Sequence, residues 1–239
     1  MNKYERFYIE IAGLCVEINA RYPFAYSHCR DYLSDRTDAD FSVSVTDAEI
    51  DAEMANYDEG TFGRDYCEDV CIYRAIAEKL PLYDRLVVHG AAVSINGRGV
   101  VFTAPSGTGK TTHIGLLMDN YPNDVSIING DKPIIHVKAD GVCVCSTPWA
   151  GKEDLNANVI SPLGTICLVA RAKENAISKI DPAQHFSFIM KQMYLPISGE
   201  SRLLTLDLAD KLAKSVDFYL LECNISSDAA KCSFEALGK

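Results

Sequence analysis

The sequence lacks the long apolar segments that would mark a membrane-spanning or secreted protein. No apolar run approaches the roughly 20 residues that a transmembrane helix needs. The stretch Met1-Asn2-Lys3-Tyr4-Glu5-Arg6 leads into polar sequence instead of an apolar signal core. Repeats and low-complexity segments are absent as well. We therefore expect a cytoplasmic protein with no membrane partner.

Basic residues are fewer than acidic ones. Lys and Arg number 23 against 33 Asp and Glu, which gives a formal net charge of -10 and a pI of about 4.9. A general nucleic-acid-binding surface needs the opposite charge, because phosphate backbones are anionic. We expect no nucleic-acid partner, although a local basic pocket is compatible with this composition.

Cysteine is present, but not in a pattern that builds a metal or disulfide framework. The nine cysteines are an odd number spread over 239 residues. The closest spacings, Cys67 to Cys71 and Cys143 to Cys145, do not resemble paired zinc-binding motifs. We interpret the cysteines as buried thiols in a reducing compartment.

The first third of the chain has alternating apolar and polar residues, the pattern of half-buried strands. Strands are predicted at Phe7–Ile11, Leu14–Ile18 and Phe41–Val45. Residues 46–64 are acidic and contain glycine, which indicates irregular structure. Apolar spacing then predicts a helix over Tyr66–Lys79, before Pro81. Residues 1–81 are thus expected to form a β-rich N-terminal region without a chemical motif.

Residues 82–239 alternate between strand-like and helix-like segments, so we predict an α/β (mixed α+β) domain there. Leu86–Ile95 is predicted to be one strand that turns back at Asn96-Gly97, a strong two-residue hairpin signal, into Arg98–Thr103. Further strands are predicted at Val125–Asn129, Ile134–Lys138, Val142–Ser146, Gly164–Arg171 and Phe218–Cys223. Helices are predicted at Lys110–Asn120, Asp181–Tyr194, Leu208–Ser215 and after Ser226.

The segment Ala104-Pro105-Ser106-Gly107-Thr108-Gly109-Lys110-Thr111 joins a predicted strand to a predicted helix. Its pattern matches the phosphate-binding loop G-x-x-x-x-G-K-[ST], except that alanine takes the first position. Gly107 and Gly109 permit the backbone angles that turn successive N–H groups toward an anion. We predict that residues Ser106, Gly107, Thr108, Gly109, Lys110, Thr111 and Thr112 bind the phosphates of a nucleoside triphosphate. Lys110 supplies the positive charge and the Thr111 hydroxyl a ligand for Mg²⁺.

His89 is predicted to lie near this loop because of the hairpin register. With a two-residue turn at Asn96-Gly97, paired positions sum to 193, so His89 falls opposite Ala104. Histidine can move a proton near neutral pH, which makes His89 a catalytic candidate. The alternative is a hydrogen-bonded histidine with a structural role only.

Three further polar side chains are candidates for the same site. Asp131 follows the predicted strand Val125–Asn129 and suits a catalytic carboxylate or a Mg²⁺ ligand; the alternative is a turn-capping residue. Lys152 lies after the Trp149-Ala150-Gly151 turn and could face the nucleotide, or belong to a solvated loop. Arg171 ends a predicted strand and could contact a phosphate, or be merely exposed.

These residues together resemble the HPr kinase and phosphoenolpyruvate carboxykinase superfamily of phosphate-loop proteins. The resemblance is carried by Val88-His89-Gly90-Ala91-Ala92, by Ala104 to Thr112 and by Ile127 to Pro133; Thr147 to Glu153 resembles small HPr-kinase-like proteins. It implies a phosphate-loop core with a mixed sheet, as in the C-terminal domain of HPr kinases. It also implies that His89, Lys110 and Asp131 act in catalysis, with Thr111 and Asp131 at the metal. Gly130 departs from the family pattern, which has a second acidic residue at that position.

The expected function is an ATP-dependent kinase, or one using another nucleoside triphosphate, that phosphorylates a hydroxyl with the help of Mg²⁺. By the resemblance, the acceptor is Ser or Thr of a protein or peptide. Two alternatives stay open. One is a nucleotide-binding regulatory module with little catalysis, which Gly130 and Ala104 favour, and the other is a small-molecule kinase or carboxykinase-like enzyme. Whether the chain forms a homo-oligomer also stays open.

Overall fold

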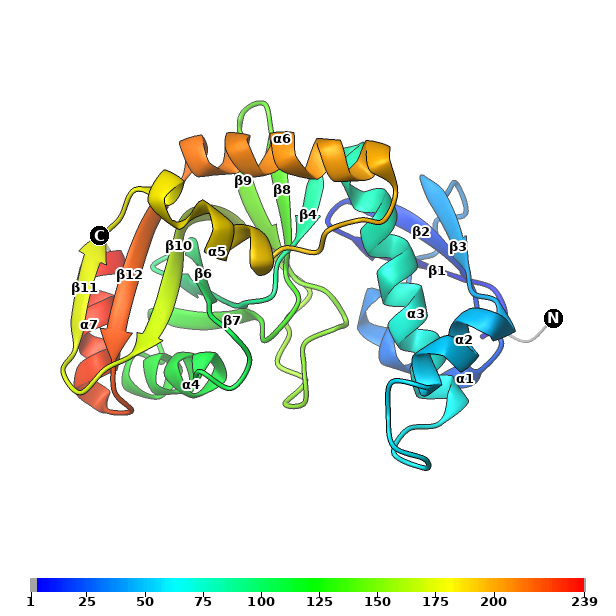
Figure 1. Ribbon diagram of the computed structural model, residues 1–239, viewed down its shortest axis with the longest axis horizontal. Helices are drawn as coiled ribbons and strands as arrows, with labels where there is room; N and C mark the ends of the chain where they lie inside the picture. Colours follow the sequence, from blue (N-terminus) through cyan, green and yellow to red (C-terminus); the bar gives the residue numbers. More distant parts are fainter. Residues whose placement is uncertain (1–3, 239) are drawn as a thin grey trace. The chain divides into compact units, whose positions relative to one another are not determined.

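The computed structural model describes residues 4–238, which group into two compact units, Met1–Lys79 and Leu80–Lys239. Each unit has its own β-sheet (Figure 1). Within residues 4–238, no helix is long and apolar enough to cross a membrane.

The sheet of the first unit has three strands in the order β1-β2-β3. β1 (Phe7–Ile11) and β2 (Leu14–Asn19) form an antiparallel hairpin, and β3 (Phe41–Ser44) pairs in parallel with β2. The turn residues Ala12 and Gly13 have φ angles of 50° and 76°, as a two-residue turn of this kind requires. All three strands were expected from the alternation of apolar residues, and that prediction is confirmed.

Helix α3 (Arg64–Lys79) is the central helix of this unit. It packs against α1 (Pro23–His28), α2 (Asp47–Met54) and β3, and residues such as Ile72 are fully buried. The helix expected over Tyr66–Lys79 is therefore present and begins slightly earlier. The short turn η1 (Arg30–Tyr32) follows α1.

Irregular structure was expected over residues 46–64, and this prediction was wrong for Asp47–Met54, which form helix α2. This helix begins with a capping box, in which the Thr46 hydroxyl accepts from the Glu49 backbone N–H and the Glu49 carboxylate accepts from the Thr46 backbone N–H. The helix is set by these two residues and not by an apolar stripe, which is why periodicity did not reveal it.

The second unit is built on a nine-stranded mixed sheet. Its main path is β4-β8-β9-β10-β6-β5-β7, and β12 pairs with both β10 and β11. The strands are β4 (Arg85–Val87), β5 (Ala91–Ile95), β6 (Arg98–Thr103), β7 (Val125–Asn129), β8 (Ile134–Lys138), β9 (Gly141–Cys145), β10 (Ile160–Arg171), β11 (Ala176–Lys179) and β12 (Asp217–Cys223). The mixed α/β class is thus confirmed.

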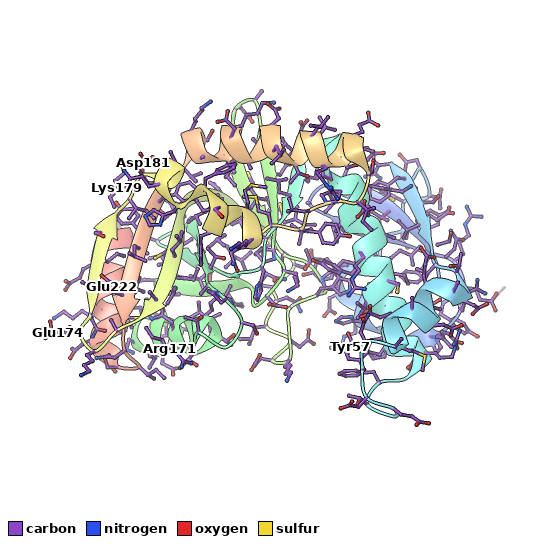
Figure 2. All side chains as sticks on the ribbon, viewed as in Figure 1. Tyr57, Arg171, Glu174, Lys179, Asp181 and Glu222 are labelled. Atoms are coloured by element: carbon purple, nitrogen blue, oxygen red, sulfur yellow. The ribbon has the colours of Figure 1, made fainter. Side chains whose placement is uncertain are left out.

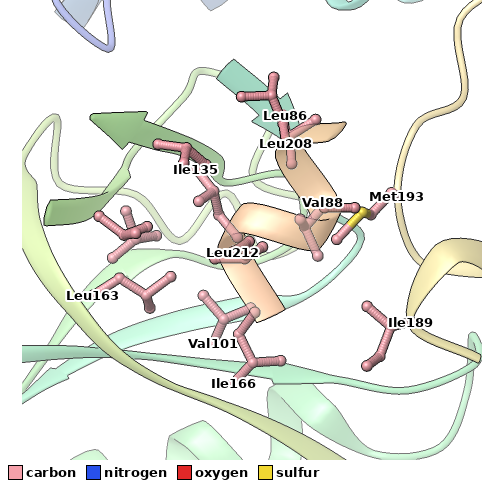
Figure 3. Packing of buried hydrophobic residues seen from close by; sticks show 14 of the residues in the cluster. Leu86, Val88, Val101, Ile135, Leu163, Ile166, Ile189, Met193, Leu208 and Leu212 are labelled. Atoms are coloured by element: carbon pink, nitrogen blue, oxygen red, sulfur yellow. The ribbon is translucent and has the colours of Figure 1, made fainter. Parts of the chain in front are cut away.

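Helices cover both faces of this sheet (Figure 1). One face packs against α5 and α6 in a core that includes Val101, Ile166 and Leu212 (Figure 3). The other packs against α4 and α7, where Phe102 and Leu117 are fully buried. Neighbouring β6 residues go to opposite faces because side chains alternate along a strand. The helical segments are η2 (Leu80–Tyr83), α4 (Lys110–Asn120), η3 (Pro182–His185), α5 (Phe186–Lys191), α6 (Gly199–Ser215) and α7 (Ser227–Leu237).

Two predicted helices differ in extent from the observed ones. The segment expected to be one helix from Asp181 to Tyr194 is instead the short turn η3 followed by α5, which ends at Lys191. Helix α6 begins at Gly199, nine residues before the predicted start at Leu208. Strand β11 was not predicted, since its residues are mostly exposed and carry no clear alternation.

The single strand predicted over Leu86–Ile95 is in fact two strands, β4 and β5, separated by Val88-His89-Gly90. β4 pairs with β8, whereas β5 pairs with β6 and β7. A Cβ atom at Gly90 would lie 2.9 Å from the Phe102 carbonyl oxygen, so only glycine permits this close crossing of the two chain segments. An uninterrupted apolar run does not reveal such a change of partner.

The hairpin β5–β6 has the predicted register, with Ile95 paired to Arg98 and Ala91 to Phe102. β6 pairs in parallel with β10, β10 pairs in parallel with β12, and both β6 and β7 are antiparallel to β5. The C-terminal ends of β6, β7, β10 and β12 therefore meet at one edge of the sheet, where ligands commonly bind in α/β folds.

Candidate functional site

A hollow of about 510 Å³ opens at this edge of the sheet. That size lies within the usual range for small-molecule sites. The hollow is lined by all but one of the residues that the sequence predicted to bind the nucleotide or to act in catalysis. They are His89, Ser106, Gly107, Gly109, Lys110, Thr111, Thr112, Asp131, Lys152 and Arg171. Thr108 instead lines a neighbouring hollow. The fold therefore brings together residues that are up to 82 positions apart in sequence, counted from His89 to Arg171.

The loop between β6 and α4 contains two glycines with positive φ angles. Gly107 and Gly109 have φ angles of 75° and 116°, and nothing lies within 4 Å of a Cβ built on either residue. Gly109 is the N-cap of α4, and no side chain caps the helix there. The first turn of α4 also contains no acidic residue. Free N–H groups and the helix dipole favour an anion at this position.

Lys110 is the first residue of α4, and its side chain is largely buried. The Lys110 Nζ donates to the carbonyl oxygen of Ala104 at 2.9 Å and lies 3.3 Å from Nε2 of His89. Burial lowers the pKa of the Lys110 ammonium, and the charge of Asp131 opposes that shift. The ammonium is thus held at the base of the loop beside the imidazole.

His89 lies between a cation and a carboxylate. The same ring nitrogen, Nε2, is 3.3 Å from Lys110 Nζ and 3.3 Å from Asp131 Oδ1. One nitrogen cannot accept from the lysine and donate to the carboxylate at once, so the proton position decides which partner it engages. The predicted pairing of His89 with Ala104 does not occur as a strand pair. Instead, the His89 carbonyl accepts from the Thr103 hydroxyl at 2.8 Å, one residue before the loop.

Asp131 is presented by a turn that Asn129 organises. The Asn129 Oδ1 accepts from the backbone N–H groups of Asp131 and Lys132, at 3.0 and 2.8 Å. Asn129 is fully buried, and its amide donates to the Thr147 carbonyl. Sequence reasoning assigned no role to Asn129, although an asparagine before Gly-Asp is a known turn-forming pattern.

Both carboxylate oxygens of Asp131 have partners. Oδ1 faces His89 and Oδ2 accepts from Lys132 Nζ at 3.0 Å. Burial alone would raise the pKa of Asp131, but the hydrogen bond with His89 and the charge of Lys132 outweigh it, so the pKa lies below its usual value. Asp131 is therefore ionised at neutral pH and can stabilise a protonated His89.

Arg171, at the end of β10, contacts the loop itself. Its Nε donates to the Thr108 carbonyl at 3.0 Å and its Nη2 to the Gly107 carbonyl at 2.5 Å. Figure 2 shows the residue beside α4 at this end of the sheet. Two of its donors are thus occupied by loop carbonyls, an arrangement that the sequence did not indicate. Lys152 lines the hollow with an exposed side chain.

Gly130 is closed to any larger residue. A Cβ atom there would lie 2.7 Å from the Ala150 carbonyl oxygen, and the Gly130 N–H donates to the Leu155 carbonyl at 2.7 Å. Ala150 and Leu155 thus pack directly on this position. The absence of an acidic side chain at Gly130 is built into the local packing.

Comparisons with known proteins add little to this geometry. No protein-family model matches the chain. No curated protein matches its sequence. One solved structure, that of the Hpr(Ser) kinase/phosphatase from Coxiella burnetii, is weakly similar, with a TM-score of 0.40 and 9% sequence identity over 62% of this chain and 86% of that chain. A similarity this weak carries no argument about function.

Proposed function

We propose that this protein binds a nucleoside triphosphate on the Ala104–Thr111 loop and transfers its terminal phosphoryl group to a hydroxyl. The proposal depends on one observation. In a hollow at the N-terminus of α4, Lys110 Nζ and Asp131 Oδ1 each lie 3.3 Å from Nε2 of His89. An ammonium, an imidazole and a carboxylate beside unused helix N–H groups provide what phosphoryl transfer requires.

Phosphate binding rests on the loop and on Lys110. The positive φ angles at Gly107 and Gly109 suit a loop whose N–H groups point toward an anion. Lys110 reaches the same hollow from the first position of α4. Its contact with the Ala104 carbonyl would be exchanged for β- and γ-phosphate oxygens, which are stronger acceptors for an ammonium than a neutral carbonyl.

In the transfer step, the acceptor oxygen forms a bond to the γ-phosphorus while the bond from that phosphorus to the β–γ bridging oxygen breaks. The nucleoside diphosphate leaves with the electron pair of the broken bond. The acceptor hydroxyl loses its proton to Nε2 of His89, and Asp131 stabilises the resulting imidazolium through its 3.3 Å contact. Lys110 neutralises charge that develops on the phosphate oxygens.

Mg²⁺ would be held by the Thr111 hydroxyl and the Asp131 carboxylate, which line the same hollow. No group of three or more His, Cys, Asp or Glu side chains suited to a metal exists among the described residues. That fits a cation that takes most of its ligands from phosphates and water. Bound there, Mg²⁺ supplies charge neutralisation at the phosphates. Direct ligation by Asp131 would compete with His89 or Lys132, which already contact its two oxygens.

The proposed acceptor is a Ser or Thr hydroxyl of a protein or peptide, and this part rests on the family resemblance of the sequence. Incubation with γ-labelled ATP, Mg²⁺ and degenerate peptides with a fixed Ser or Thr tests it, with a matched library carrying Ala at the fixed position as control. Label in the first library alone supports a peptide kinase. Label only in small hydroxyl compounds would favour a small-molecule kinase, and transfer to neither would contradict hydroxyl phosphorylation.

A second candidate function is a nucleotide-binding regulatory module with little catalysis. It is favoured by Gly130, where the Ala150 carbonyl leaves no room for a second carboxylate. The two candidates differ in turnover and not in binding. Binding of ATP with no phosphoryl transfer to any acceptor and no hydrolysis would support the regulatory module.

Three variants test the residue roles by calorimetry and by label transfer. Lys110→Ala should abolish ATP binding, whereas Lys138→Ala, an exposed lysine on β8 outside the hollow, should bind as the wild type does. His89→Ala and Asp131→Asn should bind ATP and lose transfer. Unchanged ATP affinity in Lys110→Ala would contradict phosphate binding by the Ala104–Thr111 loop. Full transfer rates in both His89→Ala and Asp131→Asn would contradict their proposed catalytic roles.

A further inference from the structure

A second hollow, of about 240 Å³, adjoins the first at the loop. Gly109, Thr112, Arg171 and Ile225 line both hollows, so the two lie directly beside each other. The second one extends between α4 and the ends of β10 and β12. One ligand can therefore occupy the anion-binding loop and this hollow at the same time.

The wall of the second hollow is mostly apolar and nearly uncharged. Leu116, Val169, Ala172 and Cys223 contribute apolar surface. His113 also lines it, and burial lowers the pKa of this imidazole to about 4, so the side chain is neutral at neutral pH. A phosphate or carboxylate would find no favourable environment here apart from Arg171. An uncharged, largely apolar group would be desolvated at little cost.

Two side chains at the junction suit a flat ring. The guanidinium of Arg171 is fixed by its bonds to the Gly107 and Thr108 carbonyls. Those bonds lie in the guanidinium plane and use its edges, so they leave its faces for stacking. Ile225, just after β12, is 74% exposed, so its apolar side chain is available to a ligand in either hollow.

We propose that the second hollow receives the heteroaromatic base of the nucleotide whose phosphates lie on the Ala104–Thr111 loop. This inference rests on the proposed function and extends it, since it assigns a binding hollow to the base of the nucleoside triphosphate. A base joined through ribose to a triphosphate is one molecule with a flat, uncharged end and an anionic end. The two adjacent hollows, one at the anion-binding loop and one mostly apolar, match these two ends of the ligand. An apolar side chain of a peptide acceptor is the competing occupant.

Calorimetry with ATP and with inorganic tripolyphosphate, each with Mg²⁺, separates the two ends of the ligand. Wild-type protein should bind ATP at least about tenfold more tightly than tripolyphosphate, because burial of the base makes the binding free energy more favourable. Ala172→Phe, which fills the second hollow, should remove that difference and leave tripolyphosphate affinity unchanged. Ala139→Phe, the same change in the exposed β8–β9 turn outside both hollows, should bind both ligands as the wild type does.

Ile225→Ser provides a second test that does not depend on a new large side chain. It should weaken ATP several-fold and leave tripolyphosphate nearly unchanged, whereas Ile197→Ser, at a residue that is 82% exposed, should have no effect. Equal wild-type affinity for the two ligands, or an Ala172→Phe variant that still prefers ATP, would overturn the base site alone. If Ala172→Phe left ATP affinity intact but blocked peptide phosphorylation, the hollow would belong to the acceptor. Failure of the wild type to bind either ligand would instead overturn the proposed function.

Discussion

His113 should make the stability of the second unit depend on pH. The side chain lies on α4 and is 3% exposed. Its Nε2 is 3.0 Å from the Ser233 hydroxyl on α7, and its Nδ1 has no hydrogen-bond partner among the described residues. The Ser233 hydroxyl is also within hydrogen-bond distance of the Ala229 and Ala230 carbonyls, to which it can donate, so we infer that Nε2 carries the proton of a neutral ring.

The sign and size of this pH dependence follow from the pKa of His113. Burial lowers it from 6.5 to about 4. Between these values the unfolded chain binds a proton that the folded protein does not, so the stability is fully present above pH 6.5 and is lost as the pH falls toward 4. A difference of about 2.5 pH units corresponds to about 3 kcal/mol of unfolding free energy.

Urea unfolding of the wild type and of His113→Gln, followed by circular dichroism at several values between pH 7.5 and 4.5, measures this effect. Glutamine keeps an N–H for Ser233 but does not titrate. Over this window the wild type should lose about 2.5 kcal/mol more unfolding free energy than the variant, because pH 4.5 is still above the folded pKa. His136, whose pKa is also lowered to about 4, is present in both proteins and cancels from the comparison. Parallel pH profiles for the two proteins would refute the reasoning.

Five other substitutions, at four positions, have distinct expected outcomes in thermal or chemical unfolding. Gly115→Ala should stabilise the fold by about 0.5–1 kcal/mol, because Gly115 lies inside α4 and nothing is within 4 Å of a Cβ built there. Gly130→Ala should destabilise the fold by about 1–3 kcal/mol, because its Cβ would meet the Ala150 carbonyl oxygen. Equal effects of the two substitutions would contradict the packing at Gly130. Thr46→Ala should cost about 1 kcal/mol through loss of the α2 capping box, and Thr46→Ser should restore most of it. Lys110→Met should unfold at a temperature no lower than the wild type, because the buried ammonium is removed, yet gain no thermal shift from ATP; a normal ATP shift would contradict the role of Lys110.

Local signals in the sequence identified much of the framework. The turn at Asn96-Gly97 set the β5–β6 register because positive φ at both residues fixes a two-residue hairpin; the angles are 51° and 82°. The start of α7 was foreseen from Ser226, whose hydroxyl accepts from the Ala229 N–H. The strand-loop-helix order around Ala104–Thr111 was readable for the same reason, since it depends on neighbouring residues only.

Other features could have been found by a closer local reading. The Thr46 and Glu49 spacing is a capping box and indicates α2. Asn129 before Gly-Asp is a turn pattern, and that turn presents Asp131. These signals are short and carry no apolar periodicity, so a search for periodic segments passes over them.

The sequence by itself identified the residues that we propose to bind phosphate or move a proton, and its hairpin signal predicted that His89 lies close to the loop. The tertiary structure alone decided how they meet. It placed the same nitrogen of His89 beside both Lys110 and Asp131, turned Arg171 onto the loop carbonyls, and closed the space at Gly130 with the chain around Ala150. These contacts join segments distant in sequence, and they depend on strand order and on packing across the sheet. No local pattern encodes them, because each requires the positions of residues from several elements at once.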